Sequence, residues 1–426
     1  MLGMGINMKR ILFIFSFILI FIFIFCECEP NKSDSVASNR DGSSNTLPVV
    51  KTQLTLLFYY EGQERFSIIS NLCNVFNNEQ NKIEVMPEFV PFEDLKKRLI
   101  TGFADGTPPD IVIFDKADQA YLADKKILVD ISDQISDWTD LDQYYENSMN
   151  SCMYKGGIYG MPFGENCLGL FYNKKMFDEE KIVPPKNWEE LRVTAKKLSK
   201  NNIKGIGICG QDSEQGFFQF LPWFYSAGAS IEKVDSPEAI NAFSLLNDLV
   251  KSGSMSREVI NWSQADVMKQ FANQKIAMML NGPWQISELK LKAPNLEYGV
   301  SKIPMDIKSV TILGGENIGV IDWKNKGYAF KFLRYVCNSE NVKSFSKAMG
   351  YFPSRKDISV DEVFEENQIT KFFENEMKEA IPRGSDPKWP EISKIVTKAL
   401  HVTLSQTKLP EAAAKDAQVS IEGILN

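Results

Sequence analysis

The sequence predicts an α/β fold with parallel sheets and crossover helices. Short apolar stretches that suit buried strands alternate with stretches whose apolar residues recur at helical spacing. The strand-like stretches are continuously apolar, which is typical of parallel sheets covered on both faces. About 380 residues follow the N-terminal segment, enough for two domains with sizeable cores.

The first half of this region alternates strand, helix, strand, helix and strand. The predicted elements are a strand at Leu54–Tyr60, a helix at Phe66–Phe76, a strand at Ile83–Val90, a helix that carries Phe92, Leu95, Leu99 and Phe103, and a strand at Asp110–Phe114. In parallel sheets, ligands bind at the carboxyl ends of the strands. The segments Tyr59–Glu61 and Phe114–Lys116 are therefore candidate binding segments.

A second α/β unit follows. A strand is predicted at Leu168–Tyr172, and Asn187 with Glu190 three residues later has the spacing of a helix capping box. The buried face of that helix is expected to consist of Trp188, Leu191, Ala195 and Leu198. Trp188 is accordingly expected in the core.

Trp284 lies at another predicted strand end. Ile276–Leu280 is a predicted strand, and Pro283 suits the first position of the helix that follows. Trp284 is therefore expected at the carboxyl end of a strand, beside a helix N-terminus.

The N-terminal segment predicts export. Lys9 and Arg10 precede the apolar run Ile11–Phe25, which is too short for a stable membrane span and suits a signal peptide, with Met8 as an alternative start. Cys26 and Cys28 end this run, and a polar stretch follows, as in bacterial lipoprotein signals. We expect a signal peptide at residues 1–28, lipidation of Cys26 or Cys28, and a flexible tether at residues 29–48 that holds the protein at the membrane surface. Ordinary cleavage and an uncleaved anchor are the alternatives to lipidation.

Composition excludes several classes of function. The formal charge is −7, or −9 without Lys9 and Arg10, and no basic block is present, so nucleic-acid binding is not expected. His401 is the single histidine and is predicted to be a surface residue of a helix. Histidine-dependent catalysis and histidine-rich metal sites are therefore not expected, and neither a catalytic residue, a metal nor a cofactor is predicted.

Two further patterns are interpreted as structural. The five cysteines beyond the tether contain no CxxC pair and are expected to be small buried residues, namely Cys73, Cys152, Cys167, Cys209 and Cys337. Gly205–Gly210 fits GxGxxG, but its glycines lie within a predicted strand and a helix precedes it, so a dinucleotide site is not expected. No phosphate-binding P-loop motif is present.

Several motifs together resemble the extracellular solute-binding proteins of bacterial ABC importers, in particular the sugar-binding family 1 that includes maltose-binding protein. They occur in the family's order across nearly the whole mature chain. These motifs are Gly106–Ile111, Gly157–Pro162, Leu170–Lys174, Asn187–Leu191, Ala277–Trp284, Leu313–Asn317 and Gly350–Arg355.

The resemblance implies a two-lobed periplasmic-binding-protein fold, each lobe a mostly parallel sheet with flanking helices, and a hinge that the chain crosses more than once. Lobe one would comprise residues 49–163 and 310–356, and lobe two residues 164–309 and 357–426. The family's ligand-binding positions fall on Tyr60, Glu61, Asp115, Lys116, Asn166, Trp284, Gly314, Gly315, Tyr351 and Trp389. The loop Gln211–Phe218 also faces the cleft in relatives.

The resemblance also implies a function. The protein would be a monomer that captures a sugar between its lobes and delivers it to the permease subunits of an ABC transporter. A sugar pocket needs aromatic faces and hydrogen-bonding groups, which these residues supply.

Three alternatives stay open. Glycerol-3-phosphate or a related phosphodiester is the rival ligand, because a helix N-terminus or Arg383 could hold its phosphate. A carbohydrate-active enzyme would need a carboxylate pair, for which Glu61, Asp115 and Glu165 are candidates. An adhesin or sensor subunit could use the same fold.

Overall fold

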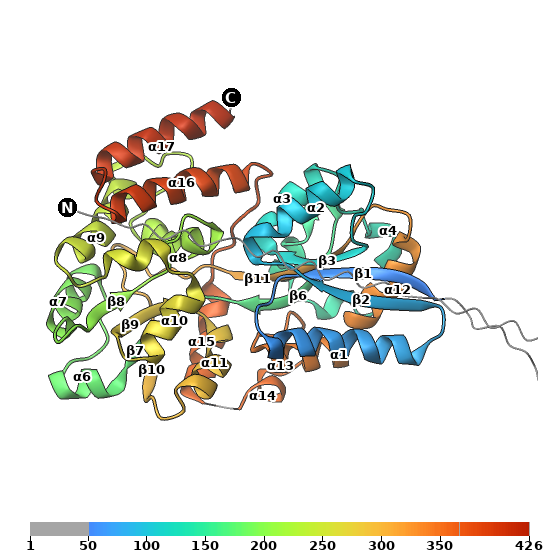
Figure 1. Ribbon diagram of the computed structural model, residues 1–426, viewed down its shortest axis with the longest axis horizontal. Coiled ribbons are helices and arrows are strands. Elements are labelled where there is room, and N and C mark those ends of the chain that lie inside the picture. The colour runs from blue at the N-terminus through green and yellow to red at the C-terminus, as the bar shows by residue number, and fades with distance from the viewer. Residues whose placement is uncertain (1–50, 366, 426) are drawn as a thin grey trace, which may run out of the picture. The chain divides into compact units, whose positions relative to one another are not determined.

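The computed structural model describes residues 51–365 and 367–425. The predicted signal peptide, the two cysteines predicted for lipidation and the predicted tether lie outside the described residues. Among the described residues, no helix is long and apolar enough to cross a membrane. Two main sheets, each accompanied by helices, make up this part of the chain (Figure 1).

The first sheet has five strands. In spatial order they are β2 (Ile83–Phe89), β1 (Thr52–Phe58), β3 (Ile111–Asp115), β11 (Gly314–Val320) and β6 (Met161–Asn166). Every residue of β3 and β11 is buried, as expected for central strands covered on both faces. The predicted strands of this region differ from the observed ones by one or two residues at their ends.

Helices cover both faces of the first sheet. On one face α1 (Gln63–Glu79), α12 (Lys326–Val336) and α13 (Ser339–Met349) pack against one another and against the strands. Figure 1 shows α2 (Leu95–Ala104) and α3 (Gln119–Asp124) on the opposite face. The smaller elements of this region are η1 (Phe92–Asp94), η2 (Lys116–Asp118), α4 (Ser132–Ile135), η3 (Leu141–Gln143), α5 (Glu146–Asn150), and the paired strands β4 (Met153–Tyr154) and β5 (Gly157–Ile158).

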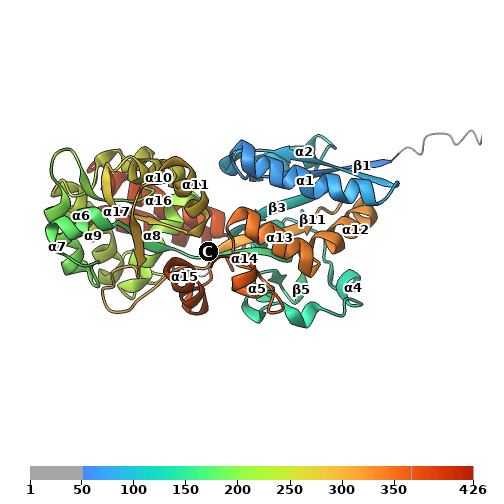
Figure 2. The same cartoon turned by 90° about the horizontal axis from the view of Figure 1, so that it is seen from below.

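The second sheet has four strands. In spatial order they are β10 (Tyr298–Ser301), β7 (Gly169–Asn173), β9 (Ile276–Asn281) and β8 (Lys204–Gly207). The associated helical elements are α6 (Lys174–Glu180), α7 (Trp188–Leu198), α8 (Glu214–Ser226), α9 (Pro237–Lys251), η4 (Arg257–Asn261), α10 (Gln264–Ala272), η5 (Pro283–Gln285), α11 (Ile286–Lys292), α14 (Val360–Val363), α15 (Gln368–Glu379), α16 (Trp389–Leu404) and α17 (Pro410–Leu425). Figure 2 shows α6, α7 and α9 among the helices around this sheet.

Both sheets are mixed, but only one strand in each runs against the others, so the prediction of mostly parallel sheets is confirmed. β1 pairs in parallel with β2 and β3, but β11 is antiparallel to both β3 and β6. In the second sheet only the β8–β9 pairing is parallel. The reason lies in the chain path: β7 and β11 bring the chain into a sheet from the other sheet, so each begins at the edge where its neighbours end.

The chain passes between the two sheets more than once, as predicted. Only Cys167 and Leu168 separate β6 of the first sheet from β7 of the second, and residues 302–313 lead back from β10 to β11. A later segment runs beside the return path, since the amide of Leu313 donates to the carbonyl of Ile381 at 2.8 Å. The lobe boundaries given above remain a prediction.

Several local predictions are confirmed. The Asn187 side chain accepts a hydrogen bond from the amide of Glu190, and the whole predicted buried face of α7 is buried. The five cysteines beyond the tether are free and buried. Gly205 and Gly207 lie in β8, a strand of the second sheet. His401 is half-buried in α16, so its predicted surface position holds only in part.

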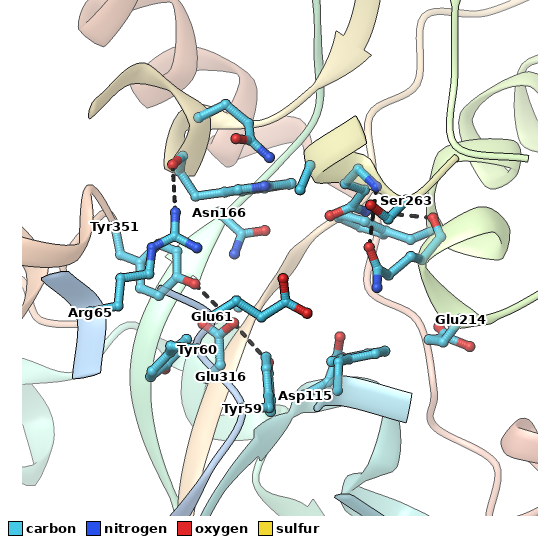
Figure 3. Close-up of a pocket in the computed structure, with 18 of the residues that line it drawn as sticks. Tyr59, Tyr60, Glu61, Arg65, Asp115, Asn166, Glu214, Ser263, Glu316 and Tyr351 are labelled. Carbon is cyan, nitrogen blue, oxygen red and sulfur yellow. Dashed lines mark hydrogen bonds between the residues drawn. The ribbon is translucent and has the colours of Figure 1, made fainter. Parts of the chain in front are cut away.

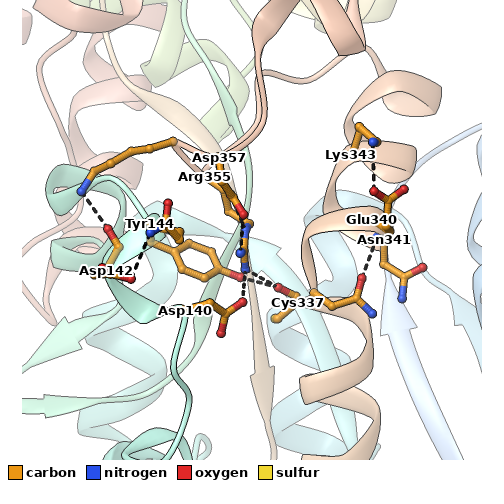
Figure 4. A network of polar contacts seen from close by, with 12 residues as sticks. Asp140, Asp142, Tyr144, Cys337, Glu340, Asn341, Lys343, Arg355 and Asp357 are labelled. Atoms are coloured by element: carbon orange, nitrogen blue, oxygen red, sulfur yellow. Dashed lines mark hydrogen bonds and ion pairs between the residues drawn. The ribbon is translucent and has the colours of Figure 1, made fainter.

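A buried arginine anchors the segment that follows α13 (Figure 4). The guanidinium of Arg355 forms ion pairs at 2.8 Å with Asp140 and Asp357, and donates to the carbonyl of Cys337 at 3.0 Å. It also lies over the ring of Tyr144, 5.0 Å from the centroid. Since only 2% of the Arg355 side chain is exposed, this network fixes the chain a few residues after Tyr351.

Candidate functional site

A pocket is lined by residues from the edges of both sheets. On the side of the first sheet, β1 ends at Phe58 and α1 begins at Gln63, so the connecting loop carries Tyr59, Tyr60 and Glu61. Gly62 has φ of 99°, a conformation that favours glycine, and ends this loop. Tyr60 is buried with 3% exposure, whereas Glu61 is exposed.

The strand register brings two acidic residues together at the same edge. Asp115 ends β3 and is the register partner of Glu316 on β11. Asn166, at the end of β6, is the register partner of Gly314. Because β1, β3 and β6 end where β11 begins, residues far apart in the sequence meet beside the pocket.

Glu316 lies at the centre of this wall (Figure 3). Its Oε1 accepts hydrogen bonds from the hydroxyls of Tyr59 at 2.9 Å and Tyr351 at 3.2 Å. Its Oε2 is buried and has no partner among the described residues. Burial and the nearby Asp115 raise the pKa of Glu316 to about 8, although the two tyrosines and Lys116 act in the opposite direction.

The second wall comes from three helical N-termini. α8 supplies Glu214 and Phe218 from its first turns, and Ser263 caps α10. Trp284 lies in η5, directly after β9, as predicted. Its ring stacks on Phe218, with centroids 6.2 Å apart, and it is 8% exposed.

Two arginines line the pocket, and each is bonded to other residues of the protein. Arg65, in the first turn of α1, donates from Nη2 to the carbonyl oxygen of Trp284 at 2.9 Å, which joins the two walls. Arg383, in the segment after α15, forms ion pairs with Asp115 at 2.9 Å and Glu214 at 2.6 Å. Its guanidinium also lies 4.4 Å from the ring centroid of Phe218.

Glu214 is surrounded by donors yet deeply buried. Besides Arg383, the indole nitrogen of Trp389 donates to it at 3.2 Å, and Ser393 donates to its other oxygen. Burial raises the pKa of Glu214 to about 7, with a smaller contribution from Asp115, while Arg383 lowers it.

Seven of the ten residues predicted to bind ligand line the pocket. They are Tyr60, Glu61, Asp115, Asn166, Trp284, Gly315 and Tyr351. Their contact with a ligand remains a prediction. The expected loop Gln211–Phe218 contributes Glu214, Gln215 and Phe218.

The other three predicted residues are not among those that line the pocket. Lys116 is buried and forms an ion pair with Glu165, which also removes Glu165 from the candidate carboxylate pair. Trp389 packs against Phe217 at 5.1 Å between centroids, behind Glu214. Gly314 lies against Asn166 and Phe218, and a side chain there would collide with both.

Arg65, Glu214 and Glu316 line the pocket but were not predicted individually. Glu316 directly follows Gly314 and Gly315, which were predicted to bind ligand. Its position next to them is the one sequence feature that could have indicated it. Arg65 and Glu214 stand in the first turns of predicted or observed helices, where no local pattern separates them from ordinary surface charges.

A model of the family described as bacterial extracellular solute-binding protein matches residues 71–371. The chain belongs to this family. Members are binding proteins rather than enzymes, and the family name agrees with the predicted extracytoplasmic location. Among the described residues, no group of three or more potential metal ligands is suitably placed to hold a metal.

Several binding proteins are similar to the chain. A putative binding protein of Brucella abortus is 26% identical, covering 82% of this chain and 88% of the relative. The maltotriose-binding protein of Pyrococcus abyssi is 23% identical, covering 72% and 67%. The sn-glycerol-3-phosphate-binding periplasmic protein UgpB of Escherichia coli K12 is 25% identical, covering 68% and 71%.

Solved structures of binding proteins share the two-lobed fold. An ABC transporter solute-binding protein of Thermotoga lettingae, bound with α-D-tagatose, is 25% identical with a TM-score of 0.81, covering 88% of this chain and 100% of that one. A maltose-bound protein of T. maritima is 22% identical with a TM-score of 0.77, covering 87% and 99%. The predicted two-lobed α/β architecture of this solute-binding protein is thereby confirmed.

Proposed function

We propose that this solute-binding protein captures an uncharged sugar in the pocket and delivers it to the permease of an ABC importer. The observation that supports a sugar over a phosphate ester is the state of Arg383. Its guanidinium is committed to Asp115 and Glu214, and the pocket also contains Glu61 and Glu316. To bind Arg383, a phosphate would have to compete with Asp115 and Glu214, whereas hydroxyls can use carboxylates as acceptors.

The aromatic residues of the pocket fit the same ligand class. Trp284 and Phe218 form one stacked pair, and Tyr59, Tyr60 and Tyr351 form an aromatic group on the facing wall. Sugars present apolar C–H faces that pack on such rings, and hydroxyls that bind polar groups between them. The Thermotoga and Pyrococcus relatives, which bind tagatose and maltotriose, support this class.

The size of the cavity favours one sugar ring. Its volume is about 140 Å³, close to the roughly 150 Å³ of a protein cavity that holds benzene. The pocket therefore has room for a group about the size of one six-membered ring, such as part of a sugar.

A thermal-shift screen tests this proposal, because a ligand that binds only the folded protein raises its melting temperature. The probes are D-glucose, D-tagatose, maltose, maltotriose and sn-glycerol-3-phosphate. We expect a rise with at least one sugar and none with the phosphate. A rise with glycerol-3-phosphate alone would replace the sugar by the rival ligand that UgpB binds.

Trp284→Ala tests the site itself. We expect calorimetric affinity for the sugar found in the screen to fall at least tenfold, because the ligand loses its stacking face. Trp323→Ala is the control, since Trp323 is a half-buried tryptophan that does not line the pocket. Normal binding by Trp284→Ala would refute this role.

We also propose that the protein is a monomeric lipoprotein, anchored through Cys26 or Cys28. The basic pair and apolar run before these cysteines support the anchor. Mass spectrometry of the native N-terminus tests it, and an unmodified peptide that begins beyond residue 28 would exclude it. Light scattering of the purified protein tests the monomer.

A further inference from the structure

Four buried polar atoms of residues that line the pocket have no hydrogen-bond partner among the described residues. They are Nε of Arg383, Oε2 of Glu316, the hydroxyl of Tyr60 and Oδ1 of Asn166. The last three belong to residues that are at most 5% exposed. Buried polar groups without partners are rare in folded proteins because leaving them unpaired costs free energy. Their convergence on one cavity marks a position where a polar ligand group would be bound.

We propose that Glu316 is a specificity-determining residue that acts as a neutral carboxylic acid and, with Tyr60 and Asn166, binds one oxygen-bearing group of the ligand. This inference rests on the proposed function and assigns a chemical role within it. The acid donates a hydrogen bond from Oε2 to a ligand oxygen, while Tyr60 and Asn166 bind the same or a neighbouring hydroxyl.

The hydrogen bonds of Glu316 set the direction of its remaining bond. Both neighbouring tyrosine hydroxyls donate to Oε1, so Oε1 acts as the carbonyl-like acceptor. The proton of the acid is then carried by Oε2, which faces no other acceptor at hydrogen-bond distance among the described residues. Burial raises the pKa of Tyr60 well above its ordinary value, with a further contribution from Glu316, so its hydroxyl also keeps its proton.

The charges around Glu316 favour its neutral form. The titratable and charged groups that face it or flank it on neighbouring elements are Asp115 on β3, Lys116 on η2, Glu165 on β6, Arg65 on α1, Tyr59 and Tyr60 after β1, and Tyr351 after α13. Asp115 opposes ionisation, and the charge of Lys116 is balanced by its ion pair with Glu165. Arg65 is held by the Trp284 carbonyl. Burial, together with the charge of Asp115, raises the pKa of Glu316 to about 8.

A consequence is that ligand binding depends on pH. If only the protonated acid binds, the dissociation constant is nearly unchanged from pH 6 to 7 and is about tenfold higher at pH 9 than at pH 7. Glutamine keeps the size and the donor and acceptor pair of the neutral acid but does not ionise in this range. Glu316→Gln should therefore bind with an affinity that changes less than about twofold over the same range.

The first experiment needs no ligand. Carbon-13 NMR of protein labelled at the glutamate carboxyl carbons identifies the Glu316 signal by its loss in Glu316→Gln. A titration midpoint near pH 8 supports the inference, and a midpoint below pH 6 overturns it whatever the protein binds.

The second experiment is calorimetry of whichever sugar raises the melting temperature, among D-glucose, D-tagatose, maltose and maltotriose. Glu61→Gln is the matched control, because it makes the same chemical change at an exposed residue of the same pocket. We expect this control to keep the tenfold loss between pH 7 and 9, whatever its affinity. An equal loss in Glu316→Gln would overturn the assignment to Glu316. If no sugar binds, both the proposed function and the proposed contact between Glu316 and the ligand are wrong. The NMR midpoint still shows whether Glu316 is protonated in the folded protein.

Discussion

Arg65 of α1 donates a hydrogen bond to the main-chain carbonyl of Trp284, from the first sheet's side of the pocket to the second sheet's side, at 2.9 Å. The bond joins a charged donor to the very residue proposed to stack on the ligand. It therefore couples the approach of the two walls to the position of the indole ring. In proteins with two conformations, a contact made in only one of them shifts the equilibrium toward it.

Arg65→Ala should consequently weaken sugar binding. Hydrogen bonds that involve a charged group contribute about 1.5–3 kcal/mol, which corresponds to roughly a tenfold to hundredfold loss of affinity. The loss should appear mainly in a faster dissociation rate, measured by stopped-flow fluorescence of the tryptophans. Arg192→Ala is the control, because Arg192 is on α7 and pairs with Asp248 at 3.7 Å on the surface. Equal dissociation rates in both variants would show that the bond does not hold the walls together.

Arg355→Met should destabilise the protein more than any surface arginine variant. The change leaves Asp140 and Asp357 without their buried partner, and the Cys337 carbonyl keeps only the hydroxyl of Tyr144 as a donor. Because the two carboxylates are 43% and 30% exposed, the expected cost is that of lost charged hydrogen bonds, about 1.5–3 kcal/mol, measured by urea unfolding. Arg355→Lys should recover only part of it, because lysine lacks the planar fork. Arg334→Met, which removes an exposed pair with Asp137, should stay within about 0.5 kcal/mol of the wild type.

Much of the pocket could be predicted from the sequence. Tyr60, Asp115 and Trp284 all lie where a predicted strand ends, and the rule that ligands bind at carboxyl ends of strands depends only on local pattern and topology. The capped helix at Asn187 was likewise visible, because its signal is contained in four residues. Such features depend on local sequence rather than on contacts between distant residues.

Features that depend on long-range packing could not be predicted. Arg383 contacts Asp115 across 268 residues and Glu214 across 169 residues, so nothing near it in the sequence shows that its charge is already balanced. Lys116 follows Asp115 directly, yet its side chain pairs with Glu165 rather than lining the pocket. The strand β11 itself was also hidden, because Ile318 and Val320 are the only large apolar residues in Gly314–Val320.

Arg383→Met tests whether this arginine stabilises the fold by pairing with Asp115 and Glu214, rather than binding a phosphate ligand. Removal leaves two buried carboxylates without their cation, and a loss of about 3–5 kcal/mol is expected at pH 8 by urea unfolding. At pH 5.5 the loss should be smaller, because Glu214, whose pKa is already raised to about 7, can then accept a proton. The double variant Arg383→Met, Glu214→Gln should recover part of the stability at pH 8. A variant as stable as the wild type would mean that Arg383 is free to bind an anion.

The stability of the ligand-free protein should fall as the pH rises from about 4.5 to about 8. Glu316 has a pKa of about 8 in the folded protein and about 4.5 when unfolded, so the folded state binds more protons within this window. Its contribution is fully present below pH 4.5 and is lost by pH 8, with a magnitude on the order of 4 kcal/mol. Glu316→Gln should therefore unfold at a similar urea concentration to the wild type at pH 5 and at a higher one at pH 8. The raised pKa of Glu214 also makes stability fall with rising pH, up to about pH 7. The stability of Glu316→Gln should therefore still fall with pH below about pH 7 and stay constant above it. Parallel curves for the two proteins from pH 5 to 8 would mean that Glu316 is ionised in the folded state.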